Sequence, residues 1–417
     1  MVNYLRNRPL WVIYLTIFVD MLGVGILIPV IPILLADPSS KFYILPSNFH
    51  LTQGYIILGL LAASYPIAQF IAAPILGQLS DRFGRKPVLL ISLIGTVISY
   101  LLFALGLWIK NIPLLFVSRI FDGTTGGNVS VAQAAIADLT PTSERSKYFG
   151  LAGAALGVGF IMGAFIGGKF SDSAVIPWFS PIVPFLAAAI LSMINVLSVI
   201  YMFKETLFAK KTALKIRITE SLENLTKAIN MEHLRVLFFS YFLLQCGFTF
   251  FTTFFSISLI QRFNFTQSAI GDFFALAGVC IAVFQILLIP RIFKRFDERI
   301  VLKYSLIGTG IAIMMYFLPK YHWQLFLITP IFALFDGLSQ TGVNSLISKS
   351  AKPEMQGSVL GISTSISAVA SAFPPILSGY IAARLTASAP IFVSALVTIG
   401  AGLVFIVWYR PQTIKNR

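Results

Sequence analysis

Charged residues are scarce in this 417-residue chain. Only 11% of its residues are Asp, Glu, Lys or Arg, whereas a soluble globular domain carries about 25%. Hydrophobic residues make up 57% of the sequence, including 38 phenylalanines. This composition excludes an ordinary water-soluble fold and predicts a protein that crosses a lipid bilayer several times.

Cysteine and histidine are almost absent. The two cysteines, Cys246 and Cys280, lie in apolar runs without metal-ligand spacing, so we expect neither a disulfide framework nor a metal site. His50, His233 and His322 show no HExxH-type spacing, which argues against an intramembrane metalloenzyme. The chain also lacks a Walker-type GK[ST] loop, so ATP is not expected to drive it. We therefore predict a protein that is not an enzyme and needs no cofactor.

The chain is rich in long apolar runs. Lipid offers no partner to a free backbone group, so a run of about 20 apolar residues is expected to cross the bilayer as a helix. The first run is too long to be a cleavable signal segment. Twelve runs qualify, at residues 10–36, 53–76, 87–108, 112–139, 144–170, 180–203, 232–260, 267–290, 299–319, 322–349, 355–384 and 387–410.

Lysine and arginine are unevenly shared between the two sides of these runs. Both termini and every second connection hold 24 of the 31 cations, the other connections hold six, and Arg119 lies inside a run. Cytoplasmic loops are the ones enriched in Lys and Arg, so both termini are predicted to be cytoplasmic. The cations are spread over short connections between apolar runs and do not form a basic domain. We therefore expect no nucleic-acid partner.

Two related halves are visible in the sequence. We predict six-helix halves at residues 1–203 and 232–417, joined by a polar linker at 204–231 that contains an amphipathic segment. The segment GQLSDRFGRK at 77–86 recurs weakly as PRIFKRFDER at 290–299. The triplet Phe-Asp-Gly recurs as well, ending at Gly123 and Gly337. Repeated halves of this kind predict alternating access around a site near the bilayer midplane.

Four segments resemble the major facilitator superfamily, and within it the bacterial tetracycline/proton antiporters. They are DMLGVGILIPVIP at 20–32, GQLSDRFGRK at 77–86, RIFDGTTGG at 119–127 and GFIMGAFIGG at 159–168. The resemblance implies an all-α membrane protein with 12 transmembrane helices in two pseudo-symmetric bundles. It also implies a bacterial inner-membrane location, and we expect a monomer.

The resemblance implies roles for two of these segments. The gating motif would use Gly77, Asp81, Arg82, Gly84, Arg85 and Lys86, with Asp81 facing the start of the eleventh span near residues 356–358. The antiporter helix motif would use Gly159, Gly163, Gly167 and Gly168. In the family a proline usually follows the second glycine, whereas this chain has Ala164. The glycine face needed for close helix packing is kept.

Charged residues in the middle of a span are costly and functional by default. Asp20, Arg119, Asp122 and Asp336 are of this kind, and we predict that they carry proton coupling. Arg119 and Asp122 lie three residues apart on one helix face, so they either neutralise each other or form a proton site whose pKa depends on their separation.

Polar and aromatic residues in the spans that line the cavity of this family are candidates for substrate contacts. They are Gln69, Asn128, Gln133, Gln245, Phe248, Gln340 and Asn344. Tetracycline antiporters carry carboxylates in the third and ninth helices and a histidine in the eighth. Ser99, Thr309 and Ile281 stand there in this chain, which argues against tetracycline itself as the substrate.

We therefore predict a secondary active transporter that couples an inward proton flux to export of a small organic or amphiphilic molecule. Its partners would be that molecule, protons and the bilayer. A metabolite or siderophore transporter on the same scaffold, with direction and coupling undecided, is the alternative. A receptor of the same fold that does not transport is a third hypothesis.

Overall fold

The computed structural model describes residues 2–141, 144–207, 219–232, 234–350 and 356–409. Every regular element in these ranges is helical, which confirms the all-α prediction. The chain divides into two compact units. Unit 1 is Met1–Glu220 with Asn264–Ala275, and unit 2 is Ser221–Phe263 with Leu276–Arg417.

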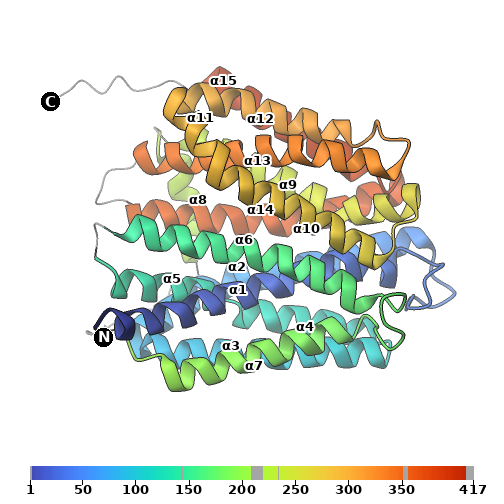
Figure 1. The fold of residues 1–417 in the computed structure, drawn as a ribbon, viewed down its shortest axis with the longest axis horizontal. Helices are drawn as coiled ribbons and strands as arrows, with labels where there is room; N and C mark the ends of the chain where they lie inside the picture. The colour runs from blue at the N-terminus through green and yellow to red at the C-terminus, as the bar shows by residue number, and fades with distance from the viewer. Residues whose placement is uncertain (1, 142–143, 208–218, 233, 351–355, 410–417) are drawn as a thin grey trace. The chain divides into compact units, whose positions relative to one another are not determined.

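Unit 1 is a bundle of roughly parallel and antiparallel helices (Figure 1). Its core contains aliphatic side chains of α1, α3, α5, α6 and α7. The helices of this unit are α1 (Val2–Leu35), α2 (Leu51–Phe83), α3 (Arg85–Trp108), α4 (Ile112–Thr125), α5 (Asn128–Leu139), α6 (Arg145–Ser171) and α7 (Val183–Met202). The first residues of α10 (Gln267–Val283) also belong to unit 1.

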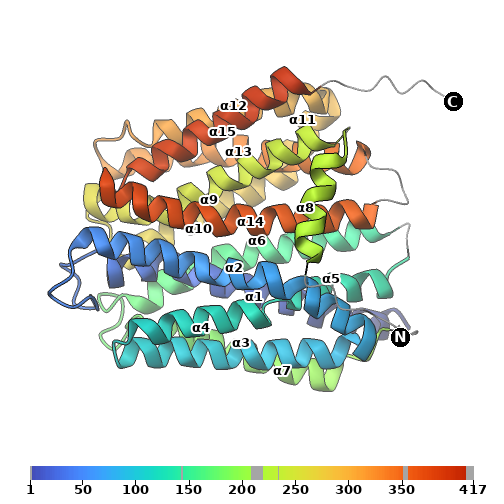
Figure 2. The ribbon, with the colours of Figure 1, turned by 180° about the vertical axis from the view of Figure 1, so that it is seen from behind.

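Unit 2 contains the remaining helices, and its core joins α8, α9, α12, α13, α14 and α15 (Figure 2). The short helix α8 (Glu220–Asn230) falls in the predicted linker and buries Ala228 while Leu222 and Ile229 stay exposed. The others are α9 (Arg235–Phe263), the π-helix η1 (Phe284–Leu288), α11 (Ile289–Arg295), α12 (Glu298–Met315), α13 (His322–Ser350), α14 (Gln356–Arg384) and α15 (Ala389–Trp408).

Ten helical stretches of the described chain are long and apolar enough to cross a membrane. The predicted fourth span is interrupted, because α4 ends at Thr125 and α5 begins at Asn128. Gly126 and Gly127 between them have ψ angles of 16° and 4°, outside the helical range. The predicted ninth span is α12, which carries three charges in its first six residues.

Glycines of α6 allow its backbone to touch that of α1. A Cβ atom on Gly159, Gly163 or Gly167 would collide with the main chain at Phe18, Leu22 or Ile26. These glycines recur every four residues, so they share one helix face. Without side chains between them the two backbones come close enough for dispersion and Cα–H···O contacts. The close packing of α1 on α6 therefore leaves no room for a Cβ at these three positions.

The substitution Gly163→Ala is expected to destabilise the protein by about 1–3 kcal/mol, because its methyl group must push α1 away. Gly153→Ala is the matched control on the same helix, since a Cβ there meets no described atom within 4 Å. The control should unfold at the original temperature or slightly above it, because alanine favours helix over glycine. Thermal unfolding of the purified variants in detergent measures both. Equal melting temperatures would show that the α1–α6 seam is not tight.

Candidate functional site

A single residue, Gly84, separates α2 from α3. The sequence predicted a loop over residues 77–86, whereas α2 continues to Phe83 and α3 begins at Arg85. Gly84 has φ = 110°, a conformation that L side chains rarely adopt. A Cβ at this position would also meet the carboxyl group of Glu205. The segment predicted to be the gating motif is therefore a sharp helical corner and not an extended loop.

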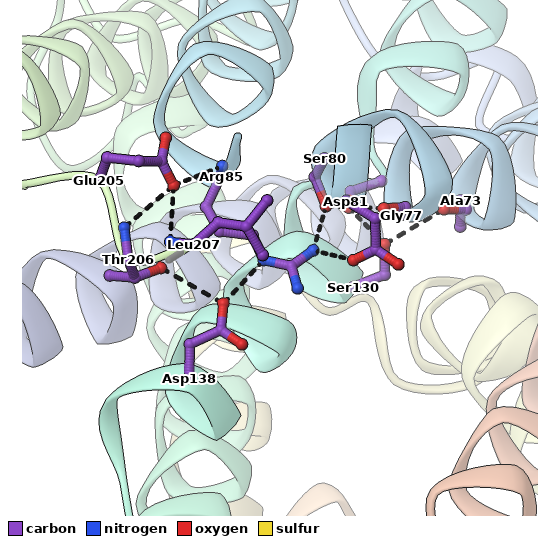
Figure 3. Close-up of polar contacts among 11 residues, drawn as sticks. Ala73, Gly77, Ser80, Asp81, Arg85, Ser130, Asp138, Glu205, Thr206 and Leu207 are labelled. Carbon is purple, nitrogen blue, oxygen red and sulfur yellow. Dashed lines mark hydrogen bonds and ion pairs between the residues drawn. The ribbon is translucent and has the colours of Figure 1, made fainter. Parts of the chain in front are cut away.

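Arg85 ties this corner to α5 (Figure 3). Its guanidinium donates from Nη1 to Asp81 Oδ1 at 2.6 Å and to Ser80 Oγ at 2.6 Å. Its Nε donates to Asp138 Oδ2 at 2.9 Å. Arg85 is 6% exposed, so these charge-assisted hydrogen bonds replace its lost hydration. Two carboxylates from different helices thus share one buried cation.

The carboxylate of Glu205, which follows α7, caps the N-terminus of α3. This carboxylate accepts hydrogen bonds from the backbone N–H groups of Arg85 at 2.9 Å and of Thr206 and Leu207 at 3.0 Å (Figure 3). It also accepts one from the backbone N–H of Lys86 at 3.1 Å. An anion at a helix N-terminus is also favoured by the helix dipole. Partial burial would raise the pKa of the Glu205 carboxyl, but these backbone donors hold it below its ordinary value.

The remaining residues of the gating motif surround this corner. Lys86 Nζ donates to the carbonyl oxygen of Ile200 in α7 at 2.8 Å, and the Arg82 guanidinium lies 5.3 Å from the ring centre of Phe83. Gly77 lies near Ser130 of α5. The expected contact of Asp81 with residues 356–358 concerns side chains outside those that the structure describes.

Three of the four predicted intramembrane charges meet in unit 1. Arg119 Nη1 donates to Asp122 Oδ2 at 2.7 Å, and both side chains are at least 95% buried. The Arg119 guanidinium also lies 4.8 Å from the ring centre of Tyr65 in α2. Tyr65 donates its hydroxyl to Asp20 Oδ2 of α1 at 3.3 Å. One tyrosine therefore joins the ion pair of α4 to the carboxylate of α1.

Gln69 and Asn128 border this charge cluster, defined here as Asp20, Arg119 and Asp122. Gln69 Nε2 donates to the Tyr65 hydroxyl at 2.9 Å and to the carbonyl oxygen of Gly126 at 2.8 Å. The second bond satisfies a backbone acceptor freed where α4 ends. Asn128 is fully buried near Asp20, and its amide makes no hydrogen bond of normal geometry with the described residues.

Asp336 of α13 has a different environment in unit 2. It is 6% exposed, and its Oδ1 finds no hydrogen-bond partner among the described residues. Gln340, one turn later, donates through Nε2 to Gln245 Oε1 of α9 at 2.7 Å. The structure thus brings two predicted substrate residues together beside a buried carboxylate.

The other predicted substrate residues are more accessible. Gln133 of α5 and Phe248 of α9 are half-buried, and Asn344 of α13 is exposed. No group of three or more His, Cys, Asp or Glu side chains in the described ranges is placed to hold a metal ion.

Sequence reasoning missed three residues that organise these sites. Asp138 and Glu205 sit at helix ends close to the predicted cytoplasmic loops, where single acidic residues are common and carry no pattern. Tyr65 lies four residues before Gln69, so the i, i+4 spacing of two polar residues in an apolar run was an available signal.

Replacing Glu205 by glutamine is expected to lower the thermal stability of the protein at neutral pH. The folded-state pKa of Glu205 lies below the unfolded value, about 4.3, so its carboxylate stabilises the fold above that pH. This contribution is lost as the pH falls through the folded-state pKa. The melting temperatures of the parent and Glu205→Gln should therefore converge toward pH 3.

Glu144→Gln is the matched control, because Glu144 precedes α6 without capping it through its side chain. Its melting temperature should follow that of the parent at every pH. A Glu205→Gln protein as stable as the parent at pH 7 would remove Glu205 from its role as the cap of α3.

Comparison with known proteins agrees with this architecture. The family model of the Major Facilitator Superfamily matches residues 13–232 and 237–417. A class H tetracycline resistance protein of Pasteurella multocida is 30% identical over 90% of this chain and 89% of its own length. Multidrug resistance protein 2 of Bacillus subtilis (strain 168) is 28% identical over 98% of this chain and 97% of its own length.

Solved structures show the same fold. A human organic anion transporter superposes with a TM-score of 0.71 at 24% identity, over 96% of this chain and 99% of that one. The inward-open xylose transporter of E. coli superposes with a TM-score of 0.73 at 16% identity, over 97% of each chain. These likenesses confirm the predicted fold of 12 helices in two halves. The chain belongs to the major facilitator superfamily and is an integral membrane transporter, not an enzyme.

Proposed function

We propose that this transporter exports a small organic molecule in exchange for protons. The observation that carries the proposal is the charge cluster of unit 1, in which Tyr65 connects the Arg119–Asp122 ion pair to a second buried carboxylate, Asp20. With Asp20, Asp122 and Arg119 all ionised, the cluster has a net charge of −1, and one added proton makes it neutral. Burying a net charge costs several kcal/mol, so protonation is coupled to how deeply the cluster is enclosed.

The connections of the cluster give it a way to respond to a proton. Protonation of Asp20 removes the negative charge that the Tyr65 hydroxyl now faces at 3.3 Å. Tyr65 also contacts Arg119 and Gln69, and Gln69 holds Gly126 at the break between α4 and α5. In this proposal, a change in the charge of Asp20 on α1 is transmitted to the break between α4 and α5, where the helical hydrogen bonds are already interrupted.

Ser99 supports the same interpretation. Tetracycline antiporters resemble this chain but carry a carboxylate in the third helix, where Ser99 stands here. The Ser99 side chain of α3 lies within hydrogen-bonding reach of the Asp122 carboxylate. We infer that Asp122, supplied by α4, provides negative charge at the place that the third helix serves in those relatives.

We propose that the corner at Gly84 is a cytoplasmic latch that changes when the transporter cycles. Arg85 holds Asp81 and Asp138 in one network, so loss of either carboxylate leaves a buried cation partly unpaired. The excess of Lys and Arg in the predicted cytoplasmic connections supports this orientation. In this proposal the halves are residues 1–203 and 232–417, joined at 204–231, and the protein works as a monomer in a bacterial inner membrane.

The cargo that we propose is a moderately polar, amphiphilic organic molecule. Gln245 and Gln340 offer amide donors and acceptors next to Asp336, and Phe248 adds an aromatic surface. Pockets for small molecules combine a largely apolar lining with a few polar groups in this way. Relatives with the printed names tetracycline and multidrug resistance protein support an exported drug-like molecule.

The substitution Asp20→Asn fixes the cluster in a neutral state and should abolish the response to a proton gradient while the protein still folds. We expect flux driven by a pH gradient to fall by about five-fold or more, the range of typical coupling energies. Proteoliposomes loaded with a fluorescent amphiphilic dye, and separately with tetracycline, measure this flux. Asp122→Asn should have the same effect, because it also removes a titratable carboxylate.

Asp37→Asn is the control, since Asp37 lies in the exposed connection after α1 and asparagine can make the same turn. It should keep the dependence on the pH gradient. Full gradient-driven flux in Asp20→Asn and in Asp122→Asn would reject the charge cluster as the proton site. Flux of the parent protein that ignores the gradient would reject proton coupling altogether.

A further inference from the structure

Asn128, the first residue of α5, is buried without a hydrogen bond. Its side chain is 0% exposed, and neither Oδ1 nor Nδ2 has a hydrogen-bond partner among the described residues. A buried unpaired amide costs free energy in the folded protein, so its presence needs an explanation. Asn195 of α7 is equally buried and shows the usual arrangement, because its Nδ2 donates to Thr16 Oγ1 of α1 at 3.0 Å.

The unpaired amide of Asn128 lies beside the Asp20 carboxylate of α1. The two side chains are within hydrogen-bonding reach, but their atoms are not in hydrogen-bonding geometry. The backbone N–H groups in the first turn of α5 also lack a side-chain cap, because Gly127 precedes them. Unused hydrogen-bonding capacity is therefore concentrated next to Asp20, at the point where the predicted fourth span is interrupted.

The charged groups and hydrogen-bonding groups on α2 and α4 that surround Asp20 already have partners. Arg119 of α4 has only donors, and Asp122 of the same helix is paired with it at 2.7 Å. The Tyr65 hydroxyl of α2 donates to Asp20 Oδ2 at 3.3 Å and accepts from Gln69 Nε2 at 2.9 Å. These groups suit an ionised Asp20, which can only accept hydrogen bonds.

Two further helices pack against α1 near Asp20. Tyr100 of α3 is 1% exposed, and its hydroxyl lies against the α1 backbone one turn beyond Asp20. Helix α6 meets α1 through Gly159 and Gly163, so no titratable side chain separates the two helices there. Among the described neighbours, Tyr100 is therefore the rival of Asn128 as an acceptor for a protonated Asp20.

A carboxylate and a carboxylic acid need different partners. The ionised form only accepts hydrogen bonds, whereas the protonated form has an O–H group that must donate one. Tyr65 can donate to one oxygen of Asp20 in both forms. The added O–H needs an acceptor of its own, and Asn128 Oδ1 is an unpaired carbonyl oxygen within reach.

We propose that Asn128 is a positioning residue for the proton, and that its Oδ1 accepts the hydrogen bond that Asp20 donates once Asp20 is protonated. The proposal rests on the proposed function, in which the charge cluster takes up one proton. The step adds that proton to the Asp20 oxygen that Tyr65 does not contact, neutralises the carboxylate and breaks no covalent bond. Complete burial of Asn128 favours this role over contact with cargo.

The pairing of Asn128 then follows the charge of Asp20. With Asp20 ionised, the amide is unpaired and lowers the stability of the fold. With Asp20 protonated, the amide is paired and contributes to stability. Asn128 thus makes the folded protein sensitive to the protonation of Asp20 without itself titrating.

Melting temperatures in detergent test this pairing without cargo and without a proton gradient. Asp20→Asn mimics the protonated carboxyl, because its amide N–H₂ can donate to Asn128 Oδ1. At about pH 9, Asn128→Leu should raise the melting temperature of the parent by about 1–4 °C, since it removes an unpaired buried amide. In the Asp20→Asn background the same substitution should lower the melting temperature, since it then breaks a buried hydrogen bond.

Asn128→Ala guards against a clash of the leucine side chain, because it removes the amide without adding volume. Its effect should differ between the two backgrounds in the same direction. Asn195→Leu is the matched control and should change the melting temperature equally in both, because the partner of Asn195 is Thr16 and not Asp20. Equal effects of Asn128→Leu in the two backgrounds, together with equal effects of Asn128→Ala, would overturn the pairing.

Tyr100→Phe tests the rival acceptor. Its effect on the melting temperature should be the same in the parent and in the Asp20→Asn background, because the proposal gives the Tyr100 hydroxyl no bond to a protonated Asp20. A dependence on the background in Tyr100→Phe that is absent in the Asn128 variants would assign the proton's hydrogen bond to Tyr100 and overturn the role of Asn128.

Flux in proteoliposomes gives the second readout. Asn128→Leu should lower the pH of half-maximal gradient-driven flux by about 0.4–1 pH unit, the equivalent of one hydrogen bond lost from the protonated form. A shift to higher pH would show that Asn128 serves the ionised carboxylate instead, which contradicts the proposal.

The two readouts separate this inference from the proposed function. Background-dependent melting temperatures in a protein whose flux ignores the pH gradient would keep the Asn128–Asp20 pair and reject proton coupling. Gradient-driven flux in a protein whose Asn128 variants behave equally in both backgrounds would keep proton coupling and reject the role of Asn128.

Discussion

Hydrocarbon offers no hydrogen-bond partner to a peptide group or an ion, and the features that matter in this transporter follow from that constraint. Backbone groups are satisfied within helices, and where α4 stops at Gly126 the freed carbonyl is taken by Gln69. Arg119 finds a carboxylate one helical turn away and an aromatic face on α2. The few polar groups within the helices described above therefore each need a particular neighbouring group as a partner.

The repeated Phe-Asp-Gly triplet shows how far two related halves have diverged. In unit 1 the aspartate, Asp122, has an arginine one turn earlier, whereas apolar residues stand before Asp336 in unit 2. Asp336 keeps its burial but leaves one carboxylate oxygen without a partner among the described residues. The same local sequence thus gives a compensated charge in one unit and an uncompensated one in the other. In the proposed function, this asymmetry separates a proton site in unit 1 from a cargo site in unit 2.

Hydropathy and motif spacing predicted the helical spans and the segments that meet at the charge cluster, because both depend on local composition. The extent of α2 was not predictable in the same way, since polar residues at a cytoplasmic surface suit a helix as well as a loop. Asp138 of α5 and Glu205, which follows α7, lie far from Arg85 in the sequence, and only the packed bundle brings them together. The spacing of Tyr65 and Gln69 was visible in the sequence, but the partners of Tyr65 on α1 and α4 were not predictable, because only packing brings them together.

The carboxylate of Glu205 has a consequence for biosynthesis. The N-terminus of α3 emerges from the ribosome long before residue 205, so its amide groups wait for a cap that only the end of α7 supplies. The corner at Gly84 cannot reach its final hydrogen bonding until the sixth span has been made. Domains commonly fold as units from the N-terminus during synthesis. The cap of α3 by Glu205 can therefore form only when the first half has been synthesised, just before translation reaches the connection to the second half.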